Sequence, residues 1–231
     1  MLRNVTLDEI SDGKLYEDND LVRAQTYDCS GCNAVCCKNM EDNIVLDPRD
    51  IFEMTRGLEA EGKRFTFNSL VSDKFIVLNL VDNVILPNIN MSNESKACSF
   101  LDENDRCQIH KHRPGICRMF PLGRYWEEQD RFKYILQVGQ CYKNNLTKVR
   151  VKEWIGIEEM QEYSSFSSNW HSYLTDVRIN LSSLDDKSCQ IFNLYNLKTF
   201  YETPYRAKDL KGFYREFSMR LRKTRQELNL N

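Results

Sequence analysis

The chain has 231 residues, of which 41% are hydrophobic and 29% charged, and its formal net charge is −2. This is the composition of an ordinary globular protein with a sizeable core, and a charge near zero gives no general argument for nucleic acid or an anionic membrane as a partner. Residues 1–20 lack the apolar run of a signal peptide, and the most apolar stretch, at 75–86, is too short to span a bilayer. We therefore expect a cytoplasmic protein that contacts no membrane.

Short elements are predicted at the start of the chain. Residues 1–28 mix acidic residues with turn formers, which favours a short helix and an extended lead-in. Residues 44–62 predict a short strand followed by a helix. The Asp-Pro pair at 47–48 suits the N-cap and the first helical position, and either Gly57 or Gly62 can end the helix.

The middle of the chain predicts hairpins and a loop. Residues 75–81 and 84–90 are rich in Ile, Val and Leu around a polar break, which indicates two strands of a hairpin. Residues 97–110 predict a second hairpin, turning at the sequence DEND. Residues 113–121 contain two prolines and predict an irregular loop, and residues 131–141 predict a strand.

Helices are predicted for the rest of the chain. Residues 158–181 and 188–202 are aromatic-rich with helical periodicity, and residues 208–228 place apolar side chains on one helical stripe. The predicted fold class is therefore α+β: a small, irregular, cysteine-rich core with short hairpins, organised by metal, plus C-terminal helices. We expect a cysteine-cluster metal-binding domain over residues 1–150 and a helical extension over 151–231 that packs on it.

The cysteines carry the strongest functional signal. The stretch CSGCNAVCC has the spacing C-x2-C-x3-C-C, and Cys-x2-Cys is the usual spacing for two thiolates on one metal. Four further cysteines follow before residue 142. The expected metal ligands are Cys29, Cys32, Cys36, Cys37, Cys98, Cys107, Cys117 and Cys141.

Several kinds of centre fit eight thiolates. A disulfide framework is not expected in a reducing compartment. Eight thiolates suit two four-coordinate sites, or one zinc and one iron–sulfur cluster such as [4Fe–4S]. Neighbouring side chains diverge, so Cys36 and Cys37 are expected to serve two adjacent centres unless one of them is a spectator. The spacing does not decide between zinc and iron, or between one centre and two.

Basic side chains near the cysteines could compensate the charge of a thiolate centre. Arg106 also lies near a candidate ligand, while Arg113 and Arg118 bracket Cys117 and a structural hydrogen-bonding role is open for these two. For Lys38 we expect a solvated surface position.

We expect the three histidines and the ninth cysteine, Cys189, to have structural roles. His110 and His112 are expected in surface or supporting positions and not as ligands, and His171 in packing or capping. Cys189 is expected to be a small buried residue. No Ser-His-Asp or Cys-His-Asn arrangement is recognisable.

Two motifs together resemble a known family. CSGCNAVCC, followed by CQIHKHRPGICRMFP at 107–121, is similar to the YkgJ-type cysteine-cluster proteins, which are described as zinc- or iron-chelating. The resemblance covers roughly residues 27–142, and it implies a metal without implying a biological task. The first motif is one residue longer here than the family's CxxCxxCC pattern. The family is also similar to the cysteine-containing part of flagellin lysine N-methylases.

Three classes of function follow, and the sequence does not decide whether the chain is an enzyme. The first is a metal-binding or accessory protein whose partners are a metal ion and, for an accessory role, another protein. The second is an iron–sulfur enzyme, either redox-active or lysine N-methylase-like, with a pocket beside the centre. The third, least favoured, is a nucleic-acid-binding zinc module that uses the basic helix at 205–225.

Overall fold

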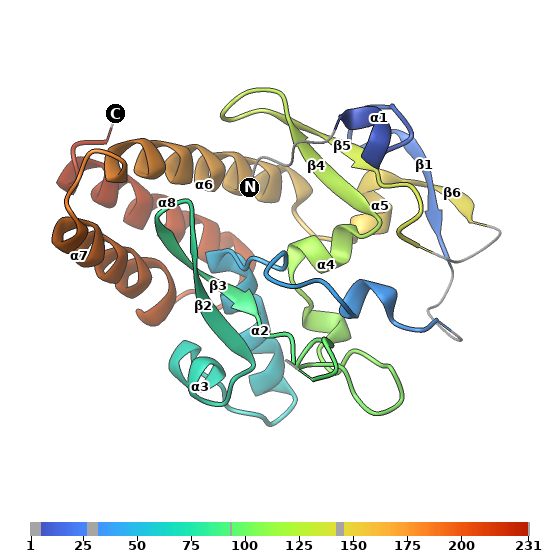
Figure 1. Cartoon of the computed structure of the whole chain (residues 1–231), viewed down its shortest axis with the longest axis horizontal. Coiled ribbons are helices and arrows are strands. Elements are labelled where there is room, and N and C mark those ends of the chain that lie inside the picture. Colours follow the sequence, from blue (N-terminus) through green and yellow to red (C-terminus); the bar gives the residue numbers. More distant parts are fainter. Residues whose placement is uncertain (1–5, 27–31, 93, 142–145, 231) are drawn as a thin grey trace.

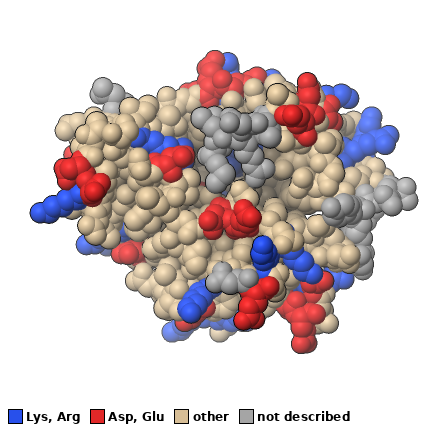
Figure 2. Space-filling view, viewed as in Figure 1, with Lys and Arg blue, Asp and Glu red and all other residues tan. Residues whose placement is uncertain are grey.

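The computed structural model describes residues 6–26, 32–92, 94–141 and 146–230 and has the predicted α+β class (Figure 1). Two-stranded antiparallel sheets and mostly short helices occupy the first two thirds of the chain, and long helices occupy the last third. None of the described helices has the length and apolar character needed to cross a membrane. Basic and acidic side chains are interspersed on the face shown in Figure 2, without a large area of one sign.

The predicted hairpin at 75–90 is confirmed. Strands β2 (Ile76–Val81) and β3 (Val84–Ile89) pair in register, with Val81 opposite Val84. Asp82 and Asn83 form the two-residue turn, and both have positive φ, at 50° and 66°. Asn and Asp tolerate this left-handed conformation, which matches the twist of the flanking strands.

Two further strand pairs were not predicted in full. Strand β4 (Leu122–Trp126) pairs with β5 (Phe132–Leu136), which is the strand predicted at 131–141 but ends five residues before Cys141. Strand β1 (Leu21–Gln25) pairs with β6 (Thr147–Arg150). The β1–β6 pair joins segments from the two ends of the cysteine-rich part. Strands of four or five residues have weak sequence patterns, and their pairing depends on partners distant in the chain.

The helices predicted near the start of the chain are present, and α2 begins at its predicted N-cap. Helix α1 (Leu7–Ile10) and α2 (Pro48–Ala60) are confirmed, and the Asp47 carboxylate accepts a hydrogen bond of 2.8 Å from the backbone of Asp50. Helix α2 ends before Gly62, so the alternative end at Gly57 was wrong. Helix α3 (Phe67–Ser72) was not predicted.

The segment between β3 and β4 differs from expectation. The predicted second hairpin at 97–110 is a series of turns with isolated bridges, at Met91–Cys98 and Leu101–Cys107. The predicted loop at 113–121 contains a helix, α4 (Gly115–Met119). Its two flanking prolines lie just outside the helix and bound it, whereas we had expected them to prevent regular structure.

The C-terminal helices are confirmed and cover one side of the molecule (Figure 1). Helix α5 (Val151–Ile155) precedes α6 (Met160–Leu181), α7 (Asp186–Leu197) runs into a π-helical turn η3 (Lys198–Glu202), and α8 (Leu210–Glu227) is the last helix.

One cluster of buried side chains includes residues from both the cysteine-rich part and the C-terminal helices. The ring of Phe52 on α2 stacks on Phe213 of α8, with centroids 4.8 Å apart. Phe166 of α6 packs edge-to-face on Phe217 of α8. The boundary at residue 150 stays a prediction.

Candidate metal centre

Six of the predicted ligands line one cavity of about 660 Å³. They come from segments that are distant in the chain: the first cysteine motif, the turns after β3, and α4. The six are Cys32, Cys36, Cys37, Cys98, Cys107 and Cys117. The remaining wall is mainly apolar and includes Ile44, Ile89, Met91 and Trp154. The structure therefore gathers thiols that the sequence alone could only count.

The first motif contributes Cys32 and the adjacent pair Cys36 and Cys37 to the cavity. A turn of 3₁₀ helix, η1 (Val35–Cys37), follows Ala34, whose φ of 52° reverses the chain direction. The Sγ atoms of Cys36 and Cys37 lie 3.8 Å apart. The expectation that these adjacent side chains diverge was wrong, since both sulfurs lie side by side at the same cavity.

Backbone pairing joins this motif to the second group of cysteines. The Cys98 amide donates to the Cys37 carbonyl at 2.8 Å, and the Asn39 amide donates to the Lys96 carbonyl at the same distance. The Nζ atom of Lys38 lies 2.6 Å from an Asp105 carboxylate oxygen. Lys38 is therefore half-buried and paired, contrary to the expectation of a solvated surface position.

The turn between Cys98 and Cys107 is fixed locally. Asp102 accepts backbone hydrogen bonds from Asn104 and Arg106 with one carboxylate oxygen, as an Asx turn does. The amide of Phe100 donates to the Cys98 sulfur at 3.4 Å. Backbone N–H groups of this kind stabilise the negative charge of a thiolate.

Helix α4 holds Cys117 at the cavity through contacts from two other elements. The Gly115 amide donates to the buried Asp50 carboxylate of α2 at 2.8 Å. The indole N–H of Trp154, on α5, donates to the Met119 carbonyl at 3.1 Å. Neither Asp50 nor Trp154 was recognised from the sequence. Asp50 has the pattern of a residue in the first turn of a helix, and Trp154 lies beyond the cysteine motifs.

Arg118 and Arg113 support the same region. The Arg118 guanidinium donates to the carbonyls of Lys111 and Arg113, which is the structural hydrogen-bonding role left open above. Arg113 lines the cavity, and its Nη1 lies 2.8 Å from Nε2 of His110. Its Nε is buried without a hydrogen-bond partner among the described residues. A buried N–H of a cation without an acceptor is costly, and an anionic group within hydrogen-bonding distance would satisfy it.

The thiols differ in acidity. A hydrogen bond from the Cys37 thiol lowers the pKa of Cys36 to about 7, with a further contribution from the positive charge of Arg113. Donating that hydrogen bond, together with burial, raises the pKa of Cys37. Burial raises the pKa of Cys98 to about 11 and that of Cys117 well above its ordinary value. Cys36 is therefore the most readily ionised of these four thiols.

The other candidates lie elsewhere. Cys29 lies outside the described residues, and Cys141 is half-buried but is not among the residues that line the cavity. Cys189, on α7, is half-buried and its thiol donates to the Leu181 carbonyl at 3.4 Å. The ring of His112 packs against Gly57, and His171 stacks on Trp126 with centroids 3.6 Å apart.

The donor set fits a thiophilic metal. Soft thiolate ligands select zinc, copper(I) and iron–sulfur clusters over hard cations. A tetrahedral Zn²⁺ with Zn–S bonds of about 2.3 Å has sulfurs roughly 3.8 Å apart, and Cys36 and Cys37 already have that separation. Within the described ranges, however, no three candidate ligands converge closely enough to hold an ion. Binding would require the cavity walls to draw the remaining sulfurs inward.

A cavity lined by six thiols on a short-hairpin α+β scaffold defines this chain as a cysteine-cluster protein. Residues 28–138 match the family model described as "CxxCxxCC: Putative zinc- or iron-chelating domain", and this part of the chain is similar to that family. The match confirms the resemblance inferred from the two motifs. No solved structure matches the chain.

Proposed function

We propose that this protein binds zinc or an iron–sulfur cluster through the thiolates of the cysteine cavity, at one or two centres. The observation that carries the proposal is the convergence of six cysteines from three separate segments on one cavity. Chance burial of small residues would not bring together thiols that are up to 85 positions apart, from Cys32 to Cys117. The family description supports the same chemistry.

The volume and the spacing favour more than a single closed zinc site. A cavity of about 660 Å³ has the volume of roughly twenty water molecules, which far exceeds one metal ion. Six thiols also exceed the four ligands of one tetrahedral centre. Cys29 and Cys141 are proposed to complete the set of eight. When bound, such a centre would crosslink the segments that carry its ligands and, if it contained iron, could transfer electrons.

The centre is proposed to organise the fold of residues 29–141. These residues contain few long elements, and the turns that carry Cys98 and Cys107 are joined to the segment after the first motif by an isolated bridge, between Lys38 and Ala97. Metal binding would then contribute directly to the free energy of folding. The described cysteines form no disulfides, and a cytoplasmic location would keep their thiols reduced. Residues 151–231 would form the helical extension on this domain.

The test is metal and acid-labile sulfide analysis of protein purified without oxygen, together with its visible absorption spectrum. One or two zinc ions per chain without sulfide would support a structural centre. Iron with matching sulfide and a broad visible absorption would support a cluster. Protein that is folded, monodisperse and free of both metals after purification, and that takes up neither on reconstitution, would contradict the proposal.

An enzymatic role is a second candidate because of the cavity's apolar wall. Ile89, Met91 and Trp154 line the cavity beside the cysteines, and apolar walls with a few convergent polar groups are typical of small-molecule sites. If this wall receives a substrate, Met91→Trp should fill it without changing the metal content. Reduction or oxidation rates of the reconstituted protein with small dyes would then fall in the variant. Unchanged rates would favour a purely structural centre.

A further inference from the structure

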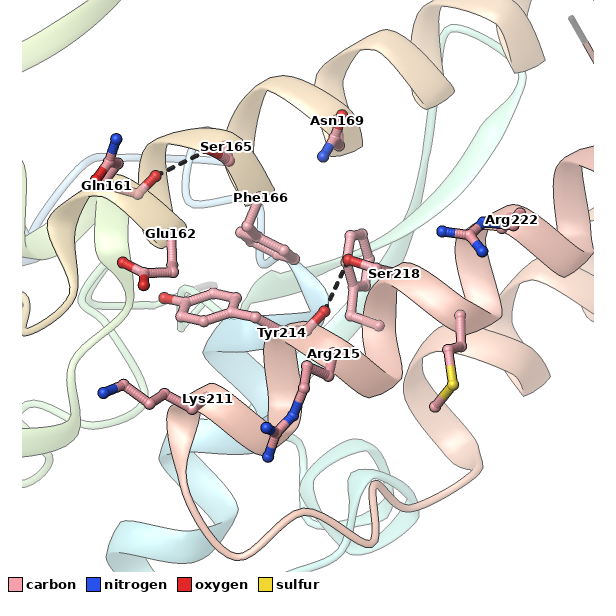
Figure 3. A pocket seen from close by; sticks show the side chains of 12 residues that line it. Gln161, Glu162, Ser165, Phe166, Asn169, Lys211, Tyr214, Arg215, Ser218 and Arg222 are labelled. Atoms are coloured by element: carbon pink, nitrogen blue, oxygen red, sulfur yellow. Dashed lines mark hydrogen bonds between the residues drawn. The ribbon is translucent and has the colours of Figure 1, made fainter.

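A groove between α6 and α8 is separate from the cysteine cavity. It has a volume of about 750 Å³, and every residue lining it belongs to one of these two helices. None of its lining residues also lines the cysteine cavity. Figure 3 shows Phe166 pointing from α6 into the space between the helices, with Tyr214 and Arg215 on the α8 side. The groove is therefore a surface of the helical part alone.

Most basic residues of α8 are neutralised within the molecule. Arg225 binds Asp176 of α6 at 2.7 Å, and Arg220 binds Glu216 at 2.7 Å while donating to three backbone carbonyls. Lys223 lies 3.6 Å from Glu227. These ion pairs within the molecule account for part of the positive charge of α8. Fewer basic side chains of this helix therefore remain for binding a partner.

The basic residues without such partners lie along the groove. Arg215 and Arg222 are exposed, line the groove and have no acidic partner among the described residues. They are seven positions apart on α8, which is about two helical turns or roughly 10 Å on the same face. Lys211 lies one turn before Arg215 at the end of the groove, where its Nζ is 3.3 Å from a Glu159 oxygen.

The groove between these charges is apolar. Its floor contains the buried rings of Phe166 and Phe217. Met219, which also lines the groove, is 63% exposed, and methionine adapts its shape to different apolar partners. The carboxamides of Gln161 and Asn169 lie on the α6 wall (Figure 3). An apolar strip beside two exposed positive charges is suited to an amphipathic segment with negative charges at matching spacing.

We propose that this groove docks an acidic amphipathic helix of a protein partner. The helix would place two carboxylates, seven positions apart, against Arg215 and Arg222, and an apolar side chain between them against Met219 and the phenylalanine floor. A helix fits because a groove between two helices accommodates the side-chain ridge of a third. The proposal is independent of the metal centre, because the groove and the cysteine cavity share no lining residue.

A nucleic acid fits this surface less well. The groove has three basic side chains, one of which is already paired, and Glu162 also lines it. Nucleic-acid surfaces need a longer array of cations that follows the phosphates. The chain as a whole is slightly acidic.

The experiment measures binding of synthetic peptides to the full-length protein by fluorescence anisotropy. The probe is a stapled helix of about 14 residues, long enough to span the groove, with two glutamates seven positions apart and a leucine midway. Matched peptides carry glutamine or lysine in place of the glutamates. A single-stranded RNA of similar length is measured in parallel. We expect only the glutamate peptide to bind, with an affinity that falls as salt rises.

Charge-reversal variants test the position of binding. Arg215→Glu/Arg222→Glu should weaken binding of the glutamate peptide by about tenfold or more. The matched control is Lys63→Glu/Arg64→Glu, which changes the net charge equally at exposed residues that do not line the groove. This control should retain most of the affinity. Because all four positions are exposed, circular dichroism and thermal melting should remain unchanged.

Several outcomes would overturn the proposal. Equal binding of the glutamine peptide would show that charge plays no part, and equal losses in both double variants would show only a global charge effect. RNA binding that exceeds peptide binding and is lost in the groove variant would assign the surface to nucleic acid. Absence of any peptide binding up to about 1 mM would remove the basis for a docking site.

Discussion

The contact between Gly115 and Tyr163 gives a quantitative test of how α4 is held. A Cβ atom added at Gly115 would lie 2.2 Å from the Tyr163 Oη. Non-bonded heavy atoms need roughly 3.5 Å, so the two groups would have to separate by more than about 1 Å. Tyr163 is fully buried, and its Oη accepts a hydrogen bond from the Arg124 guanidinium, so the ring cannot move without breaking that contact.

The expected cost of Gly115→Ala follows from these constraints. Overpacking of this kind typically costs 1–3 kcal/mol, and a disturbed buried hydrogen bond adds about 1 kcal/mol or more. Alanine is intrinsically better than glycine in a helix by up to about 1 kcal/mol, which offsets part of the cost. The net loss should be about 1–3 kcal/mol, which lowers the melting temperature by roughly 3–10 °C in a chain of this size.

The assay compares Gly115→Ala with Gly123→Ala by thermal melting and metal analysis. At Gly123 the added Cβ would first meet the Nε2 atom of Gln137, at 3.2 Å, and the flexible end of that side chain can move. The control should therefore melt within a few degrees of the parent. Because Cys117 follows Gly115 on the same short helix, the first variant should also hold less metal per folded chain. Equal melting temperatures for both variants would refute the proposed packing of α4 against α6.

Three further predictions concern the centre and its surroundings. Cys32→Ser should give protein that is insoluble or protease-sensitive and poor in metal, whereas the matched Cys189→Ser should behave like the parent; a folded, metal-replete Cys32 variant would contradict the role of that thiol. Removing metal from purified protein with a chelator should expose residues 29–141 to trypsin before α6 and α8, as followed by mass spectrometry, and an unchanged cleavage pattern would argue against a metal-organised fold. Burial raises the pKa of Asp50 to about 7, so the native state retains a proton that the unfolded chain has lost, and the free energy of unfolding should fall as pH rises from about 4 to 7. In urea titrations, the free energy of unfolding of Asp50→Asn should change little with pH over this range. If the variant keeps the pH dependence of the parent, another group is responsible for it.

Features that depend on neighbouring residues could be predicted from the sequence. Helix α2 follows from Asp47 and Pro48, and the β2–β3 hairpin follows from two apolar runs around residues that tolerate positive φ. The C-terminal helices could be predicted from the helical periodicity of their apolar side chains. The cysteine motifs are also local, since their spacing is written in the chain, and this is why the family could be inferred before any geometry was known.

Features that depend on distant partners required the tertiary structure. The segment at 115–119 is helical because Asp50 accepts from its first amide and Trp154 donates to its end, and neither partner is near it in sequence. The side-by-side sulfurs of Cys36 and Cys37 face a cavity whose other walls come from distant segments, and the general divergence of neighbouring side chains did not predict this arrangement.

The same division holds for the two sites. The sequence determined which thiols and which basic residues the chain has. Only the fold decided that six thiols share one cavity, and that Arg220 and Arg225 are neutralised while Arg215 and Arg222 remain along a groove. The physical reason is that the spacing of residues in the sequence constrains the relative positions of side chains only within a few helical turns. Whether side chains from distant segments meet depends on how the apolar surfaces of separate elements pack.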